Sequence, residues 1–99
     1  MTNEEKRECI RQWIDPEERV TVHFLDGPDL NAQVTKCNEY LVDLSIETHF
    51  PYMTQNISVP LTRIQVSEDR NHYTRDPERP LQHCRLMLVI NEKRPAIIY

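Results

Sequence analysis

The side chains best suited to bind a metal ion are histidines and cysteines, and they are scattered along the sequence. The candidates are His23, His49, His72, His83, Cys37 and Cys84. None of them shows a ligand-pair spacing such as His-x-x-x-His or Cys-x-x-Cys. His83 and Cys84 are neighbours, but adjacent residues of a strand point to opposite faces and do not easily bind one ion. We therefore predict no metal site.

Catalytic arrangements are also missing from the sequence. The chain holds a single glycine, Gly27, which excludes a glycine-rich phosphate loop. No serine–histidine–aspartate or cysteine–histidine grouping has a recognisable local frame, and the carboxylates follow the pattern of a solvated acidic surface. A chain of 99 residues forms one modest core with little room for a cleft. We predict that the protein is not an enzyme and holds no cofactor.

Composition limits the partners. Sixteen acidic side chains against twelve basic ones give a net charge of −4, which disfavours non-specific binding to duplex DNA, although a local basic patch remains open. Three widely spaced cysteines are an odd number that argues against a disulfide framework and for a reducing compartment. No apolar run approaches the ~20 residues of a membrane span, and the N-terminus lacks the order of a signal peptide. We expect a cytoplasmic protein with no membrane partner.

Hydrophobic periodicity divides the chain into one helix and several strands. Residues 3–14 have a helical pattern with Ile10, Trp13 and Ile14 on one face; Thr2 or Asn3 can cap its start, and Asp15-Pro16 ends it. From Arg19 the period changes to two, which is typical of strands. Strands are expected at 19–25, 30–34, 40–46, 56–66 (bent at Pro60) and 81–90, turns at 26–29, 38–39 and 91–95, and loops at 48–55 and 67–80.

The chain is therefore predicted to form one mainly β domain, 1–99. An N-terminal α-helix (3–14) precedes a small, strongly bent antiparallel β-barrel (19–66), a loop (67–80) and an extra C-terminal β-hairpin (81–99) closed by Ala96-Ile97-Ile98-Tyr99. The loop mixes arginines and Tyr73 with carboxylates. Such a mixture could touch single-stranded nucleic acid, but it is more typical of an ordinary solvated loop.

The order of these parts resembles the Sm-like family, and within it the Hfq branch. The first Sm motif is filled by Asp26, Gly27, Leu30 and Ala32, and it continues with Cys37, Asn38, Tyr40, Val42 and Leu44. Ala32 stands where glycine is usual. The second motif would fall on residues 56–66, where Ile57-Ser58-Val59 and Leu61-Thr62-Arg63 replace the basic triplets of that family. The residues after Ser67 have no counterpart in it.

A weaker resemblance joins Arg7 and Arg11 with Asp43 and Ser45, which match the two halves of the cyclic-dinucleotide-binding PilZ signature. Thr48 stands where that signature requires glycine. The two arginines also lie four residues apart within a good helix pattern, as they often do on solvated helix faces. We therefore set this reading aside.

The Sm-like resemblance implies a homo-oligomeric ring that could bind single-stranded RNA, with Tyr40 stacking a base and with Asn38 and Arg63 nearby. A plainer interpretation of the residues stays open, in which Tyr40 packs at a strand start and Asn38 forms a turn. The alternative function is a protein-interaction or assembly module on the same small barrel, with the hairpin 81–99, which ends in Ala96-Ile97-Ile98-Tyr99, as the interface. The expected partners are further copies of the chain, with RNA or another protein as candidates; the ring size stays open.

Overall fold

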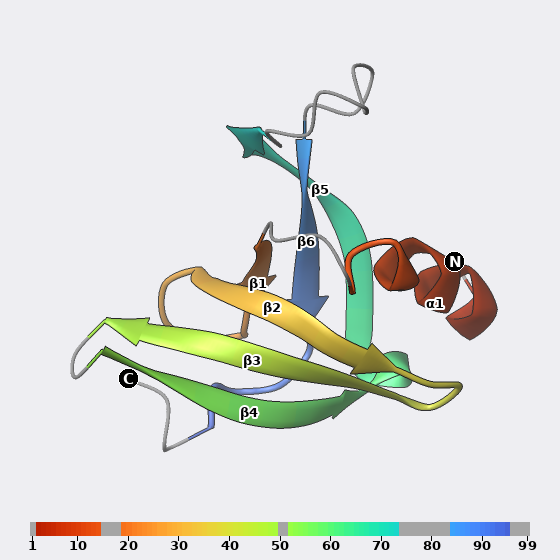
Figure 1. Ribbon diagram of the computed structural model, residues 1–99, viewed down its shortest axis with the longest axis horizontal. Coiled ribbons are helices and arrows are strands. Elements are labelled where there is room, and N and C mark those ends of the chain that lie inside the picture. The colour runs from red at the N-terminus through yellow and green to blue at the C-terminus, as the bar shows by residue number, and fades with distance from the viewer. Residues whose placement is uncertain (1, 15–18, 50–51, 74–83, 96–99) are drawn as a thin grey trace.

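The computed structural model describes residues 2–14, 19–49, 52–73 and 84–95. Figure 1 shows one helix beside a strongly curved β-sheet. The elements in chain order are α1 (Asn3–Arg11), β1 (Val20–His23), β2 (Leu30–Cys37), β3 (Leu41–His49), β4 (Tyr52–Pro60), the 3-10 turn η1 (Leu61–Arg63), β5 (Ile64–Tyr73) and β6 (Cys84–Ile90). The prediction of a mainly β chain with an N-terminal helix is confirmed.

Helix α1 begins where the sequence predicts. Thr2 is the N-cap, and its Oγ1 accepts a hydrogen bond from the Glu5 backbone N–H at 3.2 Å. The regular helix ends at Arg11, and two looser turns continue it, with Trp13 N–H donating to the Ile10 carbonyl at 2.9 Å and Ile14 N–H to that of Arg11 at 3.3 Å. Ile10 and Trp13 are buried. The predicted stop at Asp15-Pro16 lies outside the described residues.

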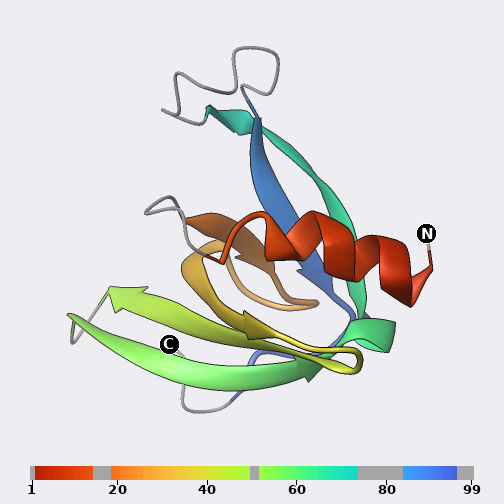
Figure 2. The same ribbon diagram turned by 45° about the vertical axis from the view of Figure 1, so that its right-hand side comes forward.

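The strands form one six-stranded sheet in the order β4-β3-β2-β1-β6-β5. All neighbours are antiparallel except β1 and β6, which pair in parallel from Thr21–Met87 to His23–Val89. Figure 2 shows β3 and β4 running crosswise to β5 and β6, so the sheet is sharply bent. The predicted antiparallel barrel is nevertheless wrong in two respects, because one pairing is parallel and the described strands leave the sheet open.

The position of β6 explains why the sheet stays open. β6 returns antiparallel to β5 and lies between β5 and β1, so β5 becomes an outer strand at the opposite end of the sheet from β4. Leu86, Leu88 and Ile90 are buried, while Met87 and Val89 on the other face are half-buried. A strand apolar on both faces suits an interior position in a sheet. The predicted separate C-terminal hairpin is therefore wrong for 84–90, and Ala96-Ile97-Ile98-Tyr99 lies outside the described residues.

The two predicted loops are in part strands. β3 continues to His49 and β4 begins at Tyr52, and these two residues pair with each other, so most of the predicted loop 48–55 belongs to a hairpin. The first half of the predicted loop 67–80 belongs to β5, which runs to Tyr73. Polar composition hid this strand, because an outer strand exposes alternate side chains to water. Residues 74–80 lie outside the part of the chain that the structure describes.

The core lies in the concave side of the bent sheet, where α1 contacts β2, η1 and β5. Its buried side chains come from every described element: Ile10, Trp13, Val20, Val22, Phe24, Leu30, Ala32, Val34, Cys37, Val42, Leu44, Ile46, Val59, Leu61, Ile64, Leu86, Leu88 and Ile90. The alternating pattern of β2 and β3 therefore follows the predicted hydrophobic period. The helix and the inner face of the sheet together exclude water from one continuous cluster.

Candidate interaction site

The turn between β2 and β3 holds two of the three residues predicted to bind nucleic acid. The Asn38 side-chain oxygen accepts hydrogen bonds from the backbone N–H groups of Tyr40 and Leu41, both at 2.8 Å. The Asn38 N–H in turn donates to the Leu41 carbonyl at 3.0 Å. This is the local side chain-to-backbone bonding that makes asparagine common in turns. The structure thus confirms the turn-forming interpretation of Asn38.

Tyr40 lies on this turn, where its backbone is hydrogen-bonded and its aromatic ring is exposed to solvent. Its carbonyl accepts a hydrogen bond from the Leu61 N–H at 2.9 Å, which ties the turn to η1. The residue is 74% exposed, so the interpretation in which Tyr40 packs into the fold is wrong. The ring borders a shallow, open depression of about 360 Å³ that is also lined by Asn3, Glu4, Arg7 and Glu39. An aromatic face held in water on a rigid turn is available to a partner.

The charges around Tyr40 are mixed. Arg7 from α1 faces Glu39, with 4.0 Å between Nη1 and Oε1, and Glu4 lies in the same depression. The carboxylates repel a phosphate backbone, while the aromatic ring can stack on a base of any sequence. The geometry thus offers a stacking surface without a basic groove to accompany it.

Arg63, the third residue predicted to bind nucleic acid, forms an ion pair outside the β2–β3 turn. Its Nε lies 3.2 Å from Oε1 of Glu92, and its carbonyl accepts a hydrogen bond from the Asn91 N–H at 2.8 Å. Arg63 therefore joins η1 to the segment after β6. The structure brings Asn38 and Tyr40 together in one turn, and it engages Arg63 in a separate contact.

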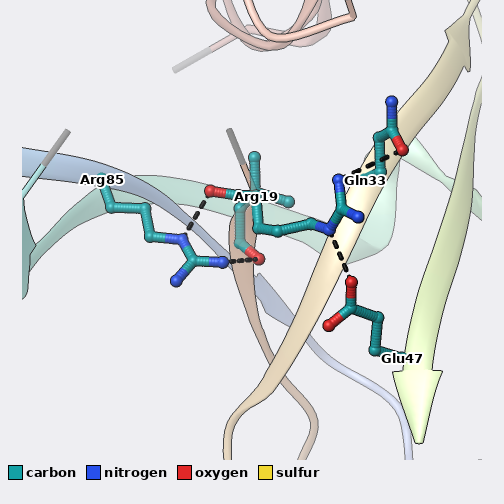
Figure 3. A network of polar contacts seen from close by, with 5 residues as sticks. Arg19, Gln33, Glu47 and Arg85 are labelled. Carbon is teal, nitrogen blue, oxygen red and sulfur yellow. Dashed lines mark hydrogen bonds and ion pairs between the residues drawn. The ribbon is translucent and has the colours of Figure 1, made fainter. Parts of the chain in front are cut away.

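A polar network fixes the start of β1 among its neighbours (Figure 3). Arg85 of β6 donates from Nε to the Arg19 carbonyl and from Nη2 to the Val20 carbonyl, the second at 3.2 Å. Arg19 itself donates from Nε to Glu47 at 2.6 Å and from Nη1 to Gln33 at 3.3 Å. The network links four strands across the middle of the sheet. Sequence reasoning missed it, because Arg19 and Arg85 lie far apart in the chain.

The outer edge of β4 is the second surface that could take a partner. The strand Tyr52-Met53-Thr54-Gln55-Asn56-Ile57-Ser58-Val59-Pro60 is nine residues long and holds no charged side chain. Its pairing with β3 runs from Leu41–Pro60 to His49–Tyr52 without a register shift. Thr54, Asn56 and Ser58 are exposed, and Gln55 and Ile57 are half-buried. A long, regular and uncharged edge strand is a template for pairing with another strand.

Sequence reasoning missed this edge because Thr48 to Gln55 was expected to be a loop. The available signal was the absence of charge from residues 50–60, which is unusual in a chain whose charged residues make up 28% of the total. A solvated loop tolerates charged residues. An edge strand that pairs with another chain disfavours them, because lysine and other charges on an edge prevent such pairing.

The opposite edge, β5, is protected. It carries the exposed Glu68 and the buried Asp69, and its pairing with β6 shifts in register between Asp69 and Tyr73. Charges and bulges are the devices by which proteins block edge-to-edge association. The two outer strands of the sheet therefore differ in charge and in the regularity of their pairing.

The cysteines show no arrangement for redox or metal chemistry in the described chain. Cys37 is buried and Cys9 is half-buried, both as free thiols, and the side chain of Cys84 is not described. Burial raises the pKa of the Cys37 thiol, with Arg11 and Arg7 acting in the opposite direction. Within residues 2–14, 19–49, 52–73 and 84–95, no three histidine, cysteine, aspartate or glutamate side chains gather as metal ligands would.

Among the described residues no helix has the length and apolar character needed to span a membrane. Comparison with protein-family models, with curated proteins and with solved structures finds no match for this chain.

Proposed function

We propose that this protein is a non-enzymatic assembly module that joins copies of itself by adding strands along the free edge of β4. The observation that carries the proposal is the nine-residue outer strand with no charged side chain and no break in its register. Strand addition takes affinity from main-chain hydrogen bonds and specificity from alternate side chains. Such an edge needs no pocket and no cofactor.

The asymmetry between the two edges supports this proposal. A sheet open at both ends presents two rows of unpaired backbone groups, and both are hazards unless they are blocked or used. The charged residues and the register shift of β5 block one of them. Within the part of the chain that the structure describes, the β4 edge has no such protection before Pro60 at its end. A strand left open in this way is consistent with a docking role.

The mass of the protein in solution tests the proposal. We expect wild-type protein to have a light-scattering mass of at least twice its 11.9 kDa chain at micromolar concentration. Asn56→Lys places a charge in the middle of the edge, and it should return the mass to that of a monomer. Thr62→Lys adds the same charge at an exposed position of η1, beyond the end of β4, and should leave the mass unchanged. A wild-type monomer at all concentrations would rule the function out.

Single-stranded RNA binding through Tyr40 is a second candidate function, and the exposure of that ring on a fixed turn favours it. Under the Sm-like interpretation, oligo(U) or oligo(A) binds at low salt, with one base stacked on the ring. Tyr40→Ala should then weaken binding by about 1–3 kcal/mol, roughly five- to 150-fold.

Fluorescence anisotropy with labelled oligo(U) and oligo(A) measures this effect. Tyr40→Phe is the control, because it keeps the stacking ring and removes only the hydroxyl. If wild-type protein binds neither oligonucleotide at low salt, the RNA function is excluded, and the assembly function is not affected.

A further inference from the structure

The β4 edge has a sequence that can pair with itself. We propose that two copies of this chain pair antiparallel along β4, about a two-fold axis that passes through Asn56, to form one continuous sheet across the dimer. This inference rests on the assembly function proposed above and names its partner and symmetry. A two-fold interface uses the same patch on both copies, so that patch must be complementary to itself.

Asn56 is the middle residue of β4 (Tyr52–Pro60). An antiparallel register with Asn56 opposite Asn56 of the second copy therefore pairs the strand over its whole length. It sets Thr54 opposite Ser58 of the second copy, and Gln55 opposite Ile57. Any shift from this register shortens the overlap and leaves strand ends unpaired.

The backbone groups also match in this register. In an antiparallel pair, alternate residues turn both their N–H and C=O toward the same neighbour. β3 takes the groups of one alternating set of β4 residues, and the other set points outward at the free edge. In the register centred on Asn56, each even-numbered residue lies opposite an even-numbered residue of the second copy, and each odd-numbered residue lies opposite an odd-numbered one. Whichever set points outward, the free groups of one copy therefore meet free groups of the other.

The side chains agree with this pairing. Thr54, Asn56 and Ser58 are exposed on one face of the strand, where cross-strand hydroxyl and amide pairs are favourable. On the other face Ile57 packs beside the core and Gln55 is half-buried. No like charges meet at any position, because the strand carries none. The edge thus meets the requirement of self-complementarity from Thr54 to Ser58.

A second copy fits this edge better through β4 than through β5. Head-to-tail pairing of β4 with β5 of the next copy would place the uncharged strand against a strand that carries the exposed Glu68 and the buried Asp69. The register shift between Asp69 and Tyr73 would also break such a pairing, and α1 packs against β5. A closed dimer is therefore favoured over a ring that needs both edges.

Disulfide trapping tests the two-fold register. Residues directly opposite in an antiparallel pair have Cα atoms about 4.5–5.5 Å apart, within the range that a disulfide can bridge. With oxidised glutathione as the oxidant, Asn56→Cys should form a covalent dimer at least ten times faster than Gln65→Cys on the exposed part of β5. Wild-type protein, with Cys9, Cys37 and Cys84, gives the background. Non-reducing gels and intact mass read the result.

The mass of charge variants separates the outcomes and does not depend on the new cysteine. The two-fold pairing is supported if wild-type protein is a dimer, if Asn56→Lys and Thr54→Lys dissociate it, and if Gln65→Lys leaves it intact. Circular dichroism checks that each variant is folded. A larger ring that both Asn56→Lys and Gln65→Lys break would overturn the two-fold pairing but keep the assembly function. A wild-type monomer, or an oligomer that neither β4 variant changes, would overturn both.

Discussion

Single residues fix the turns of this protein. Gly27 has φ +80° at the turn between β1 and β2, and Asn38 holds the turn between β2 and β3 through its side-chain oxygen. Both positions were predictable from the sequence, because glycine and asparagine form turns for local reasons. The exposure of Tyr40 was not, because a tyrosine at a strand start packs or projects according to neighbours that are distant in the chain.

Replacing Gly27 tests the demand for a positive φ. Gly27→Ala should lower the free energy of unfolding by about 1–2 kcal/mol, the cost of a left-handed conformation with a Cβ. The added Cβ would also lie 3.0 Å from Cζ of Arg94, but the end of that flexible side chain can move. Urea unfolding measures the change. Gly27→Asn is the control and should lose less, since asparagine tolerates this conformation; equal stability of Gly27→Ala and wild type would contradict the account.

The buried thiol of Cys37 gives a pH dependence with a defined sign. Burial raises its pKa above the ordinary 9.0, so the folded state keeps the proton when the unfolded chain loses it. The unfolded state then binds fewer protons, and the free energy of unfolding falls as pH rises through 9.0 and above. Urea titrations at increasing pH should show this loss, and Cys37→Ala should reduce the slope. An identical slope in both proteins would contradict it.

At the scale of elements, the helix and the hairpin β1–β2–β3 follow from local patterns, and the rest depends on the sheet as a whole. The cap at Thr2, the apolar face of Ile10 and Trp13, and the period of two after Arg19 are local signals. The hairpin of β3 and β4 was hidden by Pro51, and β5 was hidden by its polar residues. β6 was predicted as a strand, but its parallel place beside β1 depends on Arg85 and on apolar neighbours remote in sequence.

Arg85 provides a test of the parallel pairing. Its guanidinium donates to the Arg19 and Val20 carbonyls, so Arg85→Met leaves both acceptors without this donor. We expect a loss of about 1.5–3 kcal/mol in the free energy of unfolding, the usual contribution of hydrogen bonds to charged groups. Amide exchange in β1 should also become faster. Arg85→Lys, which keeps a charged donor, should lose less of the free energy of unfolding. If amide exchange in β1 of Arg85→Met is as slow as in wild-type protein, the network is dispensable.

At the scale of the whole molecule, the described strands form an open sheet, and the proposed function rests on this openness. A closed barrel would hide every edge, whereas the strands that the structure describes leave β4 with one neighbour and place charged residues and a register shift on β5. The hydrophobic period and the turn residues predicted the helix and the first turns. The resemblance to the Sm-like family could not place β6, because its motifs end before that strand. The resemblance and the open edge both favour self-association.

The solution mass of wild-type protein and of Asn56→Lys tests the central claim most directly. Light scattering across micromolar concentrations should give twice 11.9 kDa for wild type and 11.9 kDa for Asn56→Lys, with Thr62→Lys behaving as wild type. A wild-type mass of one chain at every concentration, or an oligomer that Asn56→Lys leaves intact, would contradict the claim that β4 is an assembly edge.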